Sequence, residues 1–127
     1  MKSKARDPDG YSPDQIIERL HNRIDSGVYG LDFTISARAK NEEFYQQYCI
    51  TENERVRILR CLELENYDGW EYSIYPDYPN DIVHFFHYST RLIPRGIENA
   101  PPINVDLYIK LTWTKSGNIL VIISLHD

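Results

Sequence analysis

The most constraining feature of this 127-residue chain is a pair of alternating segments near its C-terminal end. Residues 105–114 and 119–126 repeat apolar side chains at every second position, which is typical of β-strands with one buried face. The apolar positions expected to share a face are Val105, Leu107, Ile109, Leu111 and Trp113 in the first segment, and Ile119, Val121, Ile123 and Leu125 in the second. The two segments therefore predict an antiparallel hairpin.

The register of this hairpin follows from the requirement that its two apolar faces coincide. A three-residue loop over residues 115–117, with Gly117 in the left-handed conformation, pairs Ile109 with Ile123 and joins these faces. A two-residue loop at residues 116–117 would place apolar residues opposite polar ones. We therefore expect the three-residue loop.

This register gathers four reactive side chains on the polar face of the hairpin. Tyr108 is expected opposite Ser124 and Asp106 opposite His126, with Lys110 one step along the same face. A carboxylate can orient an imidazole, the imidazole can act as general acid or base, and lysine and tyrosine can hold a phosphate. The sequence thus predicts a catalytic cluster, and the alternative is an ordinary solvated sheet face. His126 also needs support, because chain ends often fray.

The first half of the chain carries the signals of helices. Residues 1–10 are polar and predict a flexible start, followed by a single domain over residues 11–127. Capping residues and apolar spacing predict helices over residues 13–26, 36–48 and from 51 to about 64. Ser12 and Gln15 form the capping box of the first helix, and Thr51 caps the third.

The second half has the composition of strands. A short extended link is expected over residues 30–35, strands over 70–75, 82–88, 105–114 and 119–126, and a long loop over 89–103. Helices followed by antiparallel strands predict an α+β fold, in which the N-terminal helices pack on one face of a C-terminal antiparallel sheet.

Composition limits the classes of function. The formal net charge of −5 argues against general nucleic-acid binding, although a site needs only a local positive field. No apolar run approaches the roughly 20 residues of a membrane span, and no apolar region follows the N-terminus as in a signal peptide. Cys49 and Cys61 match no disulfide framework or zinc pattern. We therefore expect a cytoplasmic protein with no metal site and no membrane contact.

The hairpin resembles that of the MqsR family of toxins. The matching residues are Leu107-Tyr108-Ile109-Lys110-Leu111-Thr112 and Val121-Ile122-Ile123-Ser124-Leu125, and the order of the upstream segments also agrees. The resemblance implies a RelE-like fold and a metal-independent endoribonuclease, without a cofactor, that cleaves messenger RNA by attack of a 2′-hydroxyl on the adjacent phosphate. It also implies a protein partner, the antitoxin, that silences the enzyme when bound.

Only part of that family's site is present here. Tyr108 and Lys110 match the family's strand tyrosine and lysine, and the family's lysine near the C-terminus falls on His126, which can also transfer a proton. Residues 66–69 lack the lysine that the family has after its second helix, and the family's glutamine falls on or near Phe85. These differences leave activity and substrate choice open.

Further candidates for substrate binding lie upstream of the hairpin. His84 and His87 are three residues apart, so a straight strand sends them to opposite faces and joint metal binding is not expected. Either could replace a lost family residue or be a structural histidine. Arg91 and Arg95 are candidates for binding phosphate, and the alternative is a pair of exposed loop charges.

Two other functions fit the same sequence. An acidic, aromatic-rich small protein could be an immunity or antitoxin-like protein that binds a basic partner without catalysis, which the net charge and the missing lysines favour. The chain could also be an inactive relative of the fold that is kept for assembly. A convergence of the four hairpin residues in a cleft would favour the ribonuclease.

Overall fold

The computed structural model describes residues 2–48, 50–74, 81–115 and 118–127. Within these ranges the chain forms three α-helices, one 3₁₀ helix and a five-stranded sheet. In chain order the elements are α1 Pro13–Ser26, β1 Phe33–Ile35, α2 Ala39–Gln47, α3 Glu52–Arg60, η1 Leu64–Asn66, β2 Tyr67–Tyr72, β3 Ile82–Leu92, β4 Ile103–Trp113 and β5 Leu120–His126. The α+β class expected from the sequence is confirmed.

The sheet is mixed, with the strand order β1-β5-β4-β3-β2. β1, expected only as an extended link, pairs in parallel with β5, and Phe33 lies opposite Leu120. The other neighbouring strands are antiparallel. The expectation of a wholly antiparallel sheet is therefore wrong at the β1 edge, because a strand of three residues is too short to show alternation in the sequence.

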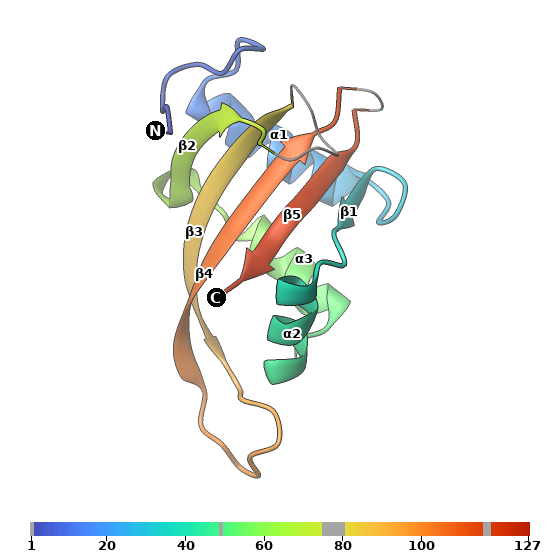
Figure 1. Ribbon diagram of the computed structural model, residues 1–127, viewed down its shortest axis with the longest axis vertical. Coiled ribbons are helices and arrows are strands. Elements are labelled where there is room, and N and C mark those ends of the chain that lie inside the picture. The colour runs from blue at the N-terminus through green and yellow to red at the C-terminus, as the bar shows by residue number, and fades with distance from the viewer. Residues whose placement is uncertain (1, 49, 75–80, 116–117) are drawn as a thin grey trace.

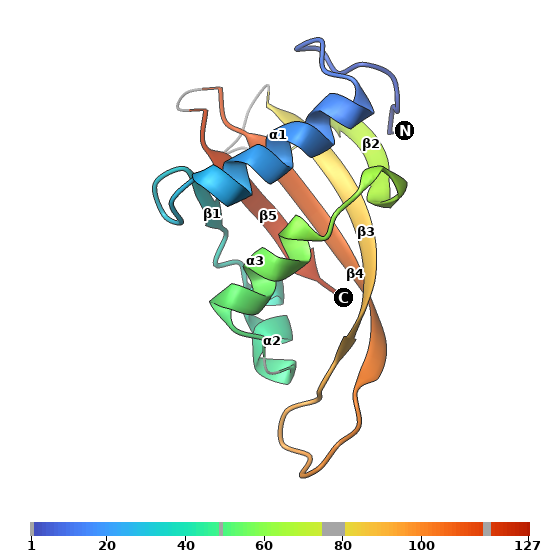
Figure 2. The same cartoon turned by 180° about the vertical axis from the view of Figure 1, so that it is seen from behind.

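The helices lie mainly on one side of the sheet. Figure 2 shows α1 and α3 crossing one face, while α2 lies beside the C-terminal part of β5. α1 has the bounds that the sequence predicts, and its capping box is present, with the Ser12 side chain accepting from the backbone N–H of Gln15. Such a cap contributes about 1 kcal/mol. The apolar stripe of α1 is buried in the core: Ile16, Ile17, Leu20 and Ile24.

Beyond the end of β5, β3 and β4 continue together as a two-stranded arm, residues 88–107 (Figure 1). β3 extends to Leu92 and β4 begins at Ile103, so the long loop expected over residues 89–103 is shorter than predicted. The loop prediction failed because Ser89 and Arg91, which are exposed in β3, and the prolines that follow resemble a polar connection.

The N-terminal segment, which we expected to be flexible, contacts the outer edge of β2. Ser3 pairs with Trp70 through both backbone groups. Asp7 is buried, and its Oδ1 accepts hydrogen bonds from the backbone N–H groups of Asp9 and Tyr11. The segment thus lies beside the sheet before α1 begins.

No helix in the described ranges is both long and apolar enough to cross a membrane. Cys61 lies at the C-cap of α3 and forms no disulfide, while Cys49 falls outside the described residues.

Candidate active site

The face of the sheet away from α1 and α3, called the open face below, carries a row of polar side chains across four strands. His87 on β3 lies opposite Tyr108 on β4, and Tyr108 lies opposite His126 on β5. Asp68 on β2 extends the row, since its Oδ1 lies 2.7 Å from Nδ1 of His87. Directly opposite residues have Cβ atoms about 4.5–5.5 Å apart. We call these four residues the open-face row.

A second row runs beside the first on the open face. Phe85 lies opposite Lys110, and Lys110 lies opposite Ser124. A cleft of about 370 Å³ opens over both rows, a volume within the range of small-ligand sites. Its polar and aromatic lining includes Lys2, Asp68, Glu71, Phe85, Tyr108, Lys110 and His126. Three of the four hairpin residues predicted from the sequence therefore line one cleft.

The position of His126 depends on a bulge in β5. Ile122 lies opposite Leu111 and Ser124 opposite Lys110, so Ile123 is an extra residue in the ladder. Past the bulge, Leu125 packs in the core and His126 points to the open face. The predicted register, with Ile109 opposite Ile123, is therefore wrong.

The register prediction failed because β5 is apolar on both faces. Leu120 and Ile122 belong to the core under the helices, whereas Val121 and Ile123 pack with Val83 on the open face. Such a strand has no polar side to fix its register. The predicted loop residues Ser116 and Gly117 fall outside the described residues, and Asn118 carries the positive φ of 49°.

Asn41 of α2 holds the bulge in place. Its side chain is fully buried, and its Nδ2 donates to the backbone carbonyls of Ser36 and Ile123. Its Oδ1 accepts from the backbone N–H of Leu125. β1 ends its pairing with β5 at Ile122, so Asn41 takes over the edge of β5 just before His126. This support answers the concern that the C-terminal strand would fray.

Hydrogen bonds define the tautomers of both imidazoles in the open-face row. Nδ1 of His126 lies 2.8 Å from the backbone carbonyl of Asp127, and Nδ1 of His87 lies 2.7 Å from the Asp68 carboxylate. Carbonyl and carboxylate oxygens only accept, so each Nδ1 carries the hydrogen. In each neutral imidazole Nε2 then keeps its lone pair and can accept a proton.

A bulge in β2 brings Asp68 to His87. Tyr67 lies opposite Phe86 and Gly69 opposite Phe85, so Asp68 is the extra residue. Sequence reasoning missed Asp68 as a site residue. The available signal was Gly69, because a glycine inside a strand often marks a bulge or a close backbone approach.

Gly69 also admits the N-terminal segment to the edge of the cleft. Its φ is +117°, and a Cβ built on it would lie 2.6 Å from the carbonyl oxygen of Ser3. The neighbouring Lys2 places its Nζ 4.5 Å from the centroid of the Phe85 ring, and Nζ of Lys110 lies 5.7 Å from the same ring. Two lysines far apart in the sequence thus meet over Phe85.

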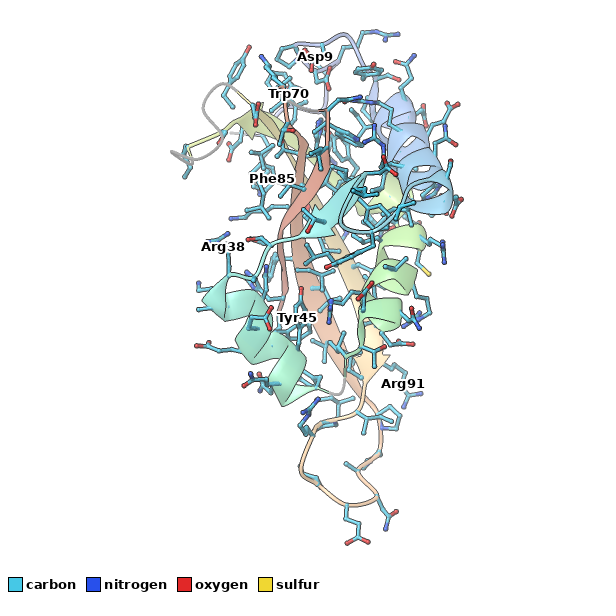
Figure 3. All side chains as sticks on the ribbon, turned by 90° about the vertical axis from the view of Figure 1, so that its right-hand side faces the viewer. Asp9, Arg38, Tyr45, Trp70, Phe85 and Arg91 are labelled. Atoms are coloured by element: carbon cyan, nitrogen blue, oxygen red, sulfur yellow. The ribbon has the colours of Figure 1, made fainter. Side chains whose placement is uncertain are left out.

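A third cation comes from the start of α2. Nη1 of Arg38, the N-cap residue, donates to Oγ of Ser124 at 2.9 Å, beside the second row. Figure 3 shows Arg38 and Phe85 on the same side of the molecule, away from α1 and α3. No sequence pattern indicated Arg38, since its approach to β5 depends on how α2 packs at the edge of the sheet.

With this geometry established, comparisons with known proteins add no relative. No family model, curated protein or solved structure matches this chain. The chemistry of the open face therefore rests on the arrangement of its own residues.

Asp106 does not join the open-face row. It lies on the arm opposite Ser89, whose Oγ donates to Oδ1 of Asp106 at 2.6 Å. His126 lies opposite Tyr108 instead. The expected pairing of Asp106 with His126 is thus wrong because the bulge shifts the register of β5, and Asp68 supplies the only carboxylate bonded to a histidine of the row among the described residues.

His84 and His87 point to opposite faces of β3, as their spacing predicts. His84 is 2% exposed on the helix side, where its Nδ1 lies 2.9 Å from the Tyr67 hydroxyl and its ring packs on Trp113. Burial first, and the charge of Arg19 second, lower the pKa of His84 to about 3. His84 is therefore separated from the cleft, and of the two histidines only His87 lies on the open face, beside the cleft residues Asp68 and Tyr108.

The two arginine candidates lie farther along the arm. Arg91 is opposite Asn104 and places Nη2 3.4 Å from the Pro102 carbonyl. Arg95 is exposed in the loop, where its backbone N–H donates to the carbonyl of Gln47. Arg91 is four residues from His87, or roughly 14 Å along the strand. Neither arginine lines the cleft, and contact with a more distant phosphate stays a prediction.

Among the described residues, no group of three or more histidine, cysteine, aspartate and glutamate side chains is arranged to hold a metal ion.

Proposed function

We propose that this protein is a metal-independent endoribonuclease of a toxin–antitoxin system, with the RelE-like fold that its resemblance to MqsR implies. The observation that carries the proposal is the open-face row, in which Tyr108 lies between His87 and His126 on neighbouring strands. The imidazole of His126 lines the cleft, and that of His87 lies beside it, next to the lining residues Tyr108 and Asp68. The two imidazoles supply both groups that proton transfer requires.

The open-face row can catalyse the attack of an RNA 2′-hydroxyl on the adjacent 3′-phosphate. Nε2 of His126 takes the proton of the 2′-hydroxyl as the 2′-oxygen bonds to phosphorus. Protonated His87, whose Nδ1–H is held by Asp68, gives its Nε2 proton to the departing 5′-oxygen as the phosphorus–oxygen bond breaks. The products are a 2′,3′-cyclic phosphate and a free 5′-hydroxyl.

The charge developing on the phosphate needs hydrogen-bond donors fixed in advance. Lys2, Lys110 and the phenol of Tyr108 line the cleft and suit this role, while Arg38 lies beside it at Ser124. A protein with a net charge of −5 thereby presents three cationic side chains around one site. Phe85, between the two lysines, offers an apolar surface on which a base can stack.

The proposal is tested by RNA cleavage in EDTA with purified wild-type protein and the His126→Ala, His87→Ala and Asp106→Asn variants. We expect wild type to cleave single-stranded RNA, each histidine variant to lose about 100-fold or more, and Asp106→Asn to keep most of the activity. Asp106→Asn is the matched control, because it removes a charge from the same face outside the row.

If folded wild-type protein cleaves no RNA, the ribonuclease proposal is rejected. The acidic net charge then favours an antitoxin-like or immunity protein that binds a basic partner. If Asp106→Asn is inactive while His87→Ala is active, the row has been assigned wrongly.

A further inference from the structure

A second cleft, of about 420 Å³, lies on the other side of the molecule from the open face. Its walls come from the C-terminal half of α1, the connection to β1 and the end of β4. The side chains that matter for its chemistry are Arg19, Asn22, Arg23, Asp32 and Trp113. None of these residues belongs to the open-face row.

Arg19 is held in this cleft by stacking rather than by hydrogen bonds. Its guanidinium carbon lies 4.1 Å from the ring centroid of Tyr11 and 4.2 Å from that of Trp113. Among the described residues it has no hydrogen-bond or ion-pair partner. Stacking occupies the faces of the guanidinium and leaves the N–H groups at its edge able to donate. The side chain is thus ordered before any ligand arrives.

Arg23 lies one turn farther along α1 on the same face. Its Nη1 donates to the backbone carbonyls of Asp32 and Asn118, at 3.0 and 2.7 Å. These acceptors are uncharged, so they orient Arg23 without neutralising it. The single carboxylate in the lining, that of Asp32, accepts from the backbone N–H of Val28.

The cleft therefore holds two ordered guanidinium groups against one carboxylate, in a protein of net charge −5. From this arrangement we propose that the α1–β1 cleft binds a phosphate group. A phosphate offers oxygen atoms in several directions and can meet both guanidinium groups at once, whereas a carboxylate is satisfied by one bidentate arginine. The amide of Asn22, on the same helix, adds a further donor.

The proposal is tested by titrating ¹⁵N-labelled protein with inorganic phosphate at constant ionic strength. We expect saturable shifts of the Arg19 and Arg23 Nε–H signals and of the Trp113 indole N–H. Arg23→Gln should weaken binding by about tenfold or more. Arg57→Gln is the matched control, since Arg57 is an exposed α3 arginine paired with Glu54.

Asn22→Asp provides a second variant, because Asn22 is exposed and the change adds a negative charge without removing the arginines. It too should weaken binding. Shifts that do not saturate, that chloride reproduces, or that neither variant alters would overturn the proposal, as would tighter binding of an acidic peptide than of phosphate.

A last binding experiment distinguishes the sources of the phosphate. Read from the Arg19 and Arg23 Nε–H signals, tighter binding of a 2′-O-methylated single-stranded RNA than of a nucleoside monophosphate would identify an RNA backbone in this cleft. Equal or weaker binding at these signals would identify a free phosphate ester. Because the cleft lies apart from the open-face row, loss of phosphate binding and loss of RNA cleavage are independent results.

Discussion

At the scale of single residues, two histidines of β3 show how position decides chemistry. His87 is 54% exposed and bonded to Asp68, while His84 is buried against Tyr67 and Trp113. Asp7 lies 3.8 Å from Nε2 of His84, but this contact is not an ion pair, because the lowered pKa keeps the imidazole neutral. The two side chains thus have different roles: one suits proton transfer, and the other supports the fold.

The buried His84 makes the fold sensitive to acid. The unfolded chain protonates this histidine near pH 6.5, whereas the folded protein does so only near pH 3. Between these values the unfolded state binds one more proton than the folded state. The free energy of unfolding therefore decreases as the pH is lowered, by up to about 1.4 kcal/mol per pH unit. Urea unfolding from pH 7 to 4.5 should show this loss in wild type and a smaller one in His84→Gln. Parallel curves for the two proteins would refute the assignment.

Gly69 is the residue on which the N-terminal segment depends. Gly69→Ala combines strain at a φ of +117° with a collision against the Ser3 carbonyl, and we expect a loss of roughly 1–3 kcal/mol. The Ser3 amide, which donates to Trp70, should exchange its hydrogen faster, and RNA cleavage should fall as Lys2 leaves the cleft.

Gly96→Ala is the matched control for Gly69→Ala. Its φ is +83°, but a Cβ there meets no atom within 4 Å. Equal effects on Ser3 exchange in both variants would show that backbone strain, and not the close approach, accounts for the result.

At the scale of elements, α1 is predictable from the sequence and the register of β5 is not. α1, capped by Ser12, was predicted to the residue, since its capping box and apolar stripe are local. The register of β5 is not local, because it depends on the contact between Asn41 and the backbone of Ile123 and Leu125. The prediction that Tyr108, Lys110 and His126 share one face is confirmed. The predicted cross-strand partners are wrong, because Tyr108 lies opposite His126 and Lys110 opposite Ser124.

Asn41 should therefore control both stability and the placement of His126. Asn41→Ala leaves the Ile123 carbonyl and the Leu125 N–H buried without partners, at about 1–3 kcal/mol each. We expect faster amide exchange at Leu125 and slower RNA cleavage at a temperature where the variant is folded. Asn53→Ala, at an exposed position of α3, should change neither. Unchanged exchange at Leu125 in Asn41→Ala would remove Asn41 from this role.

At the scale of the whole molecule, positive side chains from distant parts of the chain gather on one side of the sheet, where the carboxylates of Asp68 and Glu71 also line the cleft. Lys2, Arg38 and Lys110 approach one side of the sheet from three parts of the chain. A net charge read from the sequence cannot show this, because folding sets the distances between charges. The local field, and not the total charge, decides where an anionic chain can bind.

This concentration of charge predicts the salt dependence of RNA binding. If three cations each neutralise one phosphate, the affinity for single-stranded RNA should fall with a log–log slope against salt of about −2. A fully 2′-O-methylated RNA, which lacks the attacking hydroxyl, allows this measurement by fluorescence anisotropy without cleavage. The Lys2→Gln, Arg38→Gln double variant should flatten the slope to about −0.7.

Lys115→Gln, an exposed lysine after β4, should leave that slope unchanged and controls for the loss of total charge. A slope that is equally steep in the double variant would place the bound RNA elsewhere on the surface.

Insertions are expected to have different effects in the body of the sheet and in the arm of β3 and β4. In the body of the sheet an extra residue changes which side chains face the cleft, as Ile123 does in β5. Beyond the row the arm pairs with itself and, at Pro94 and Arg95, with the end of α2, and its tip turns at Gly96 and Asn99, both with positive φ. A tag or an affinity peptide inserted at that tip would reach solvent without disturbing the sheet, so the tip of the arm is a suitable insertion site.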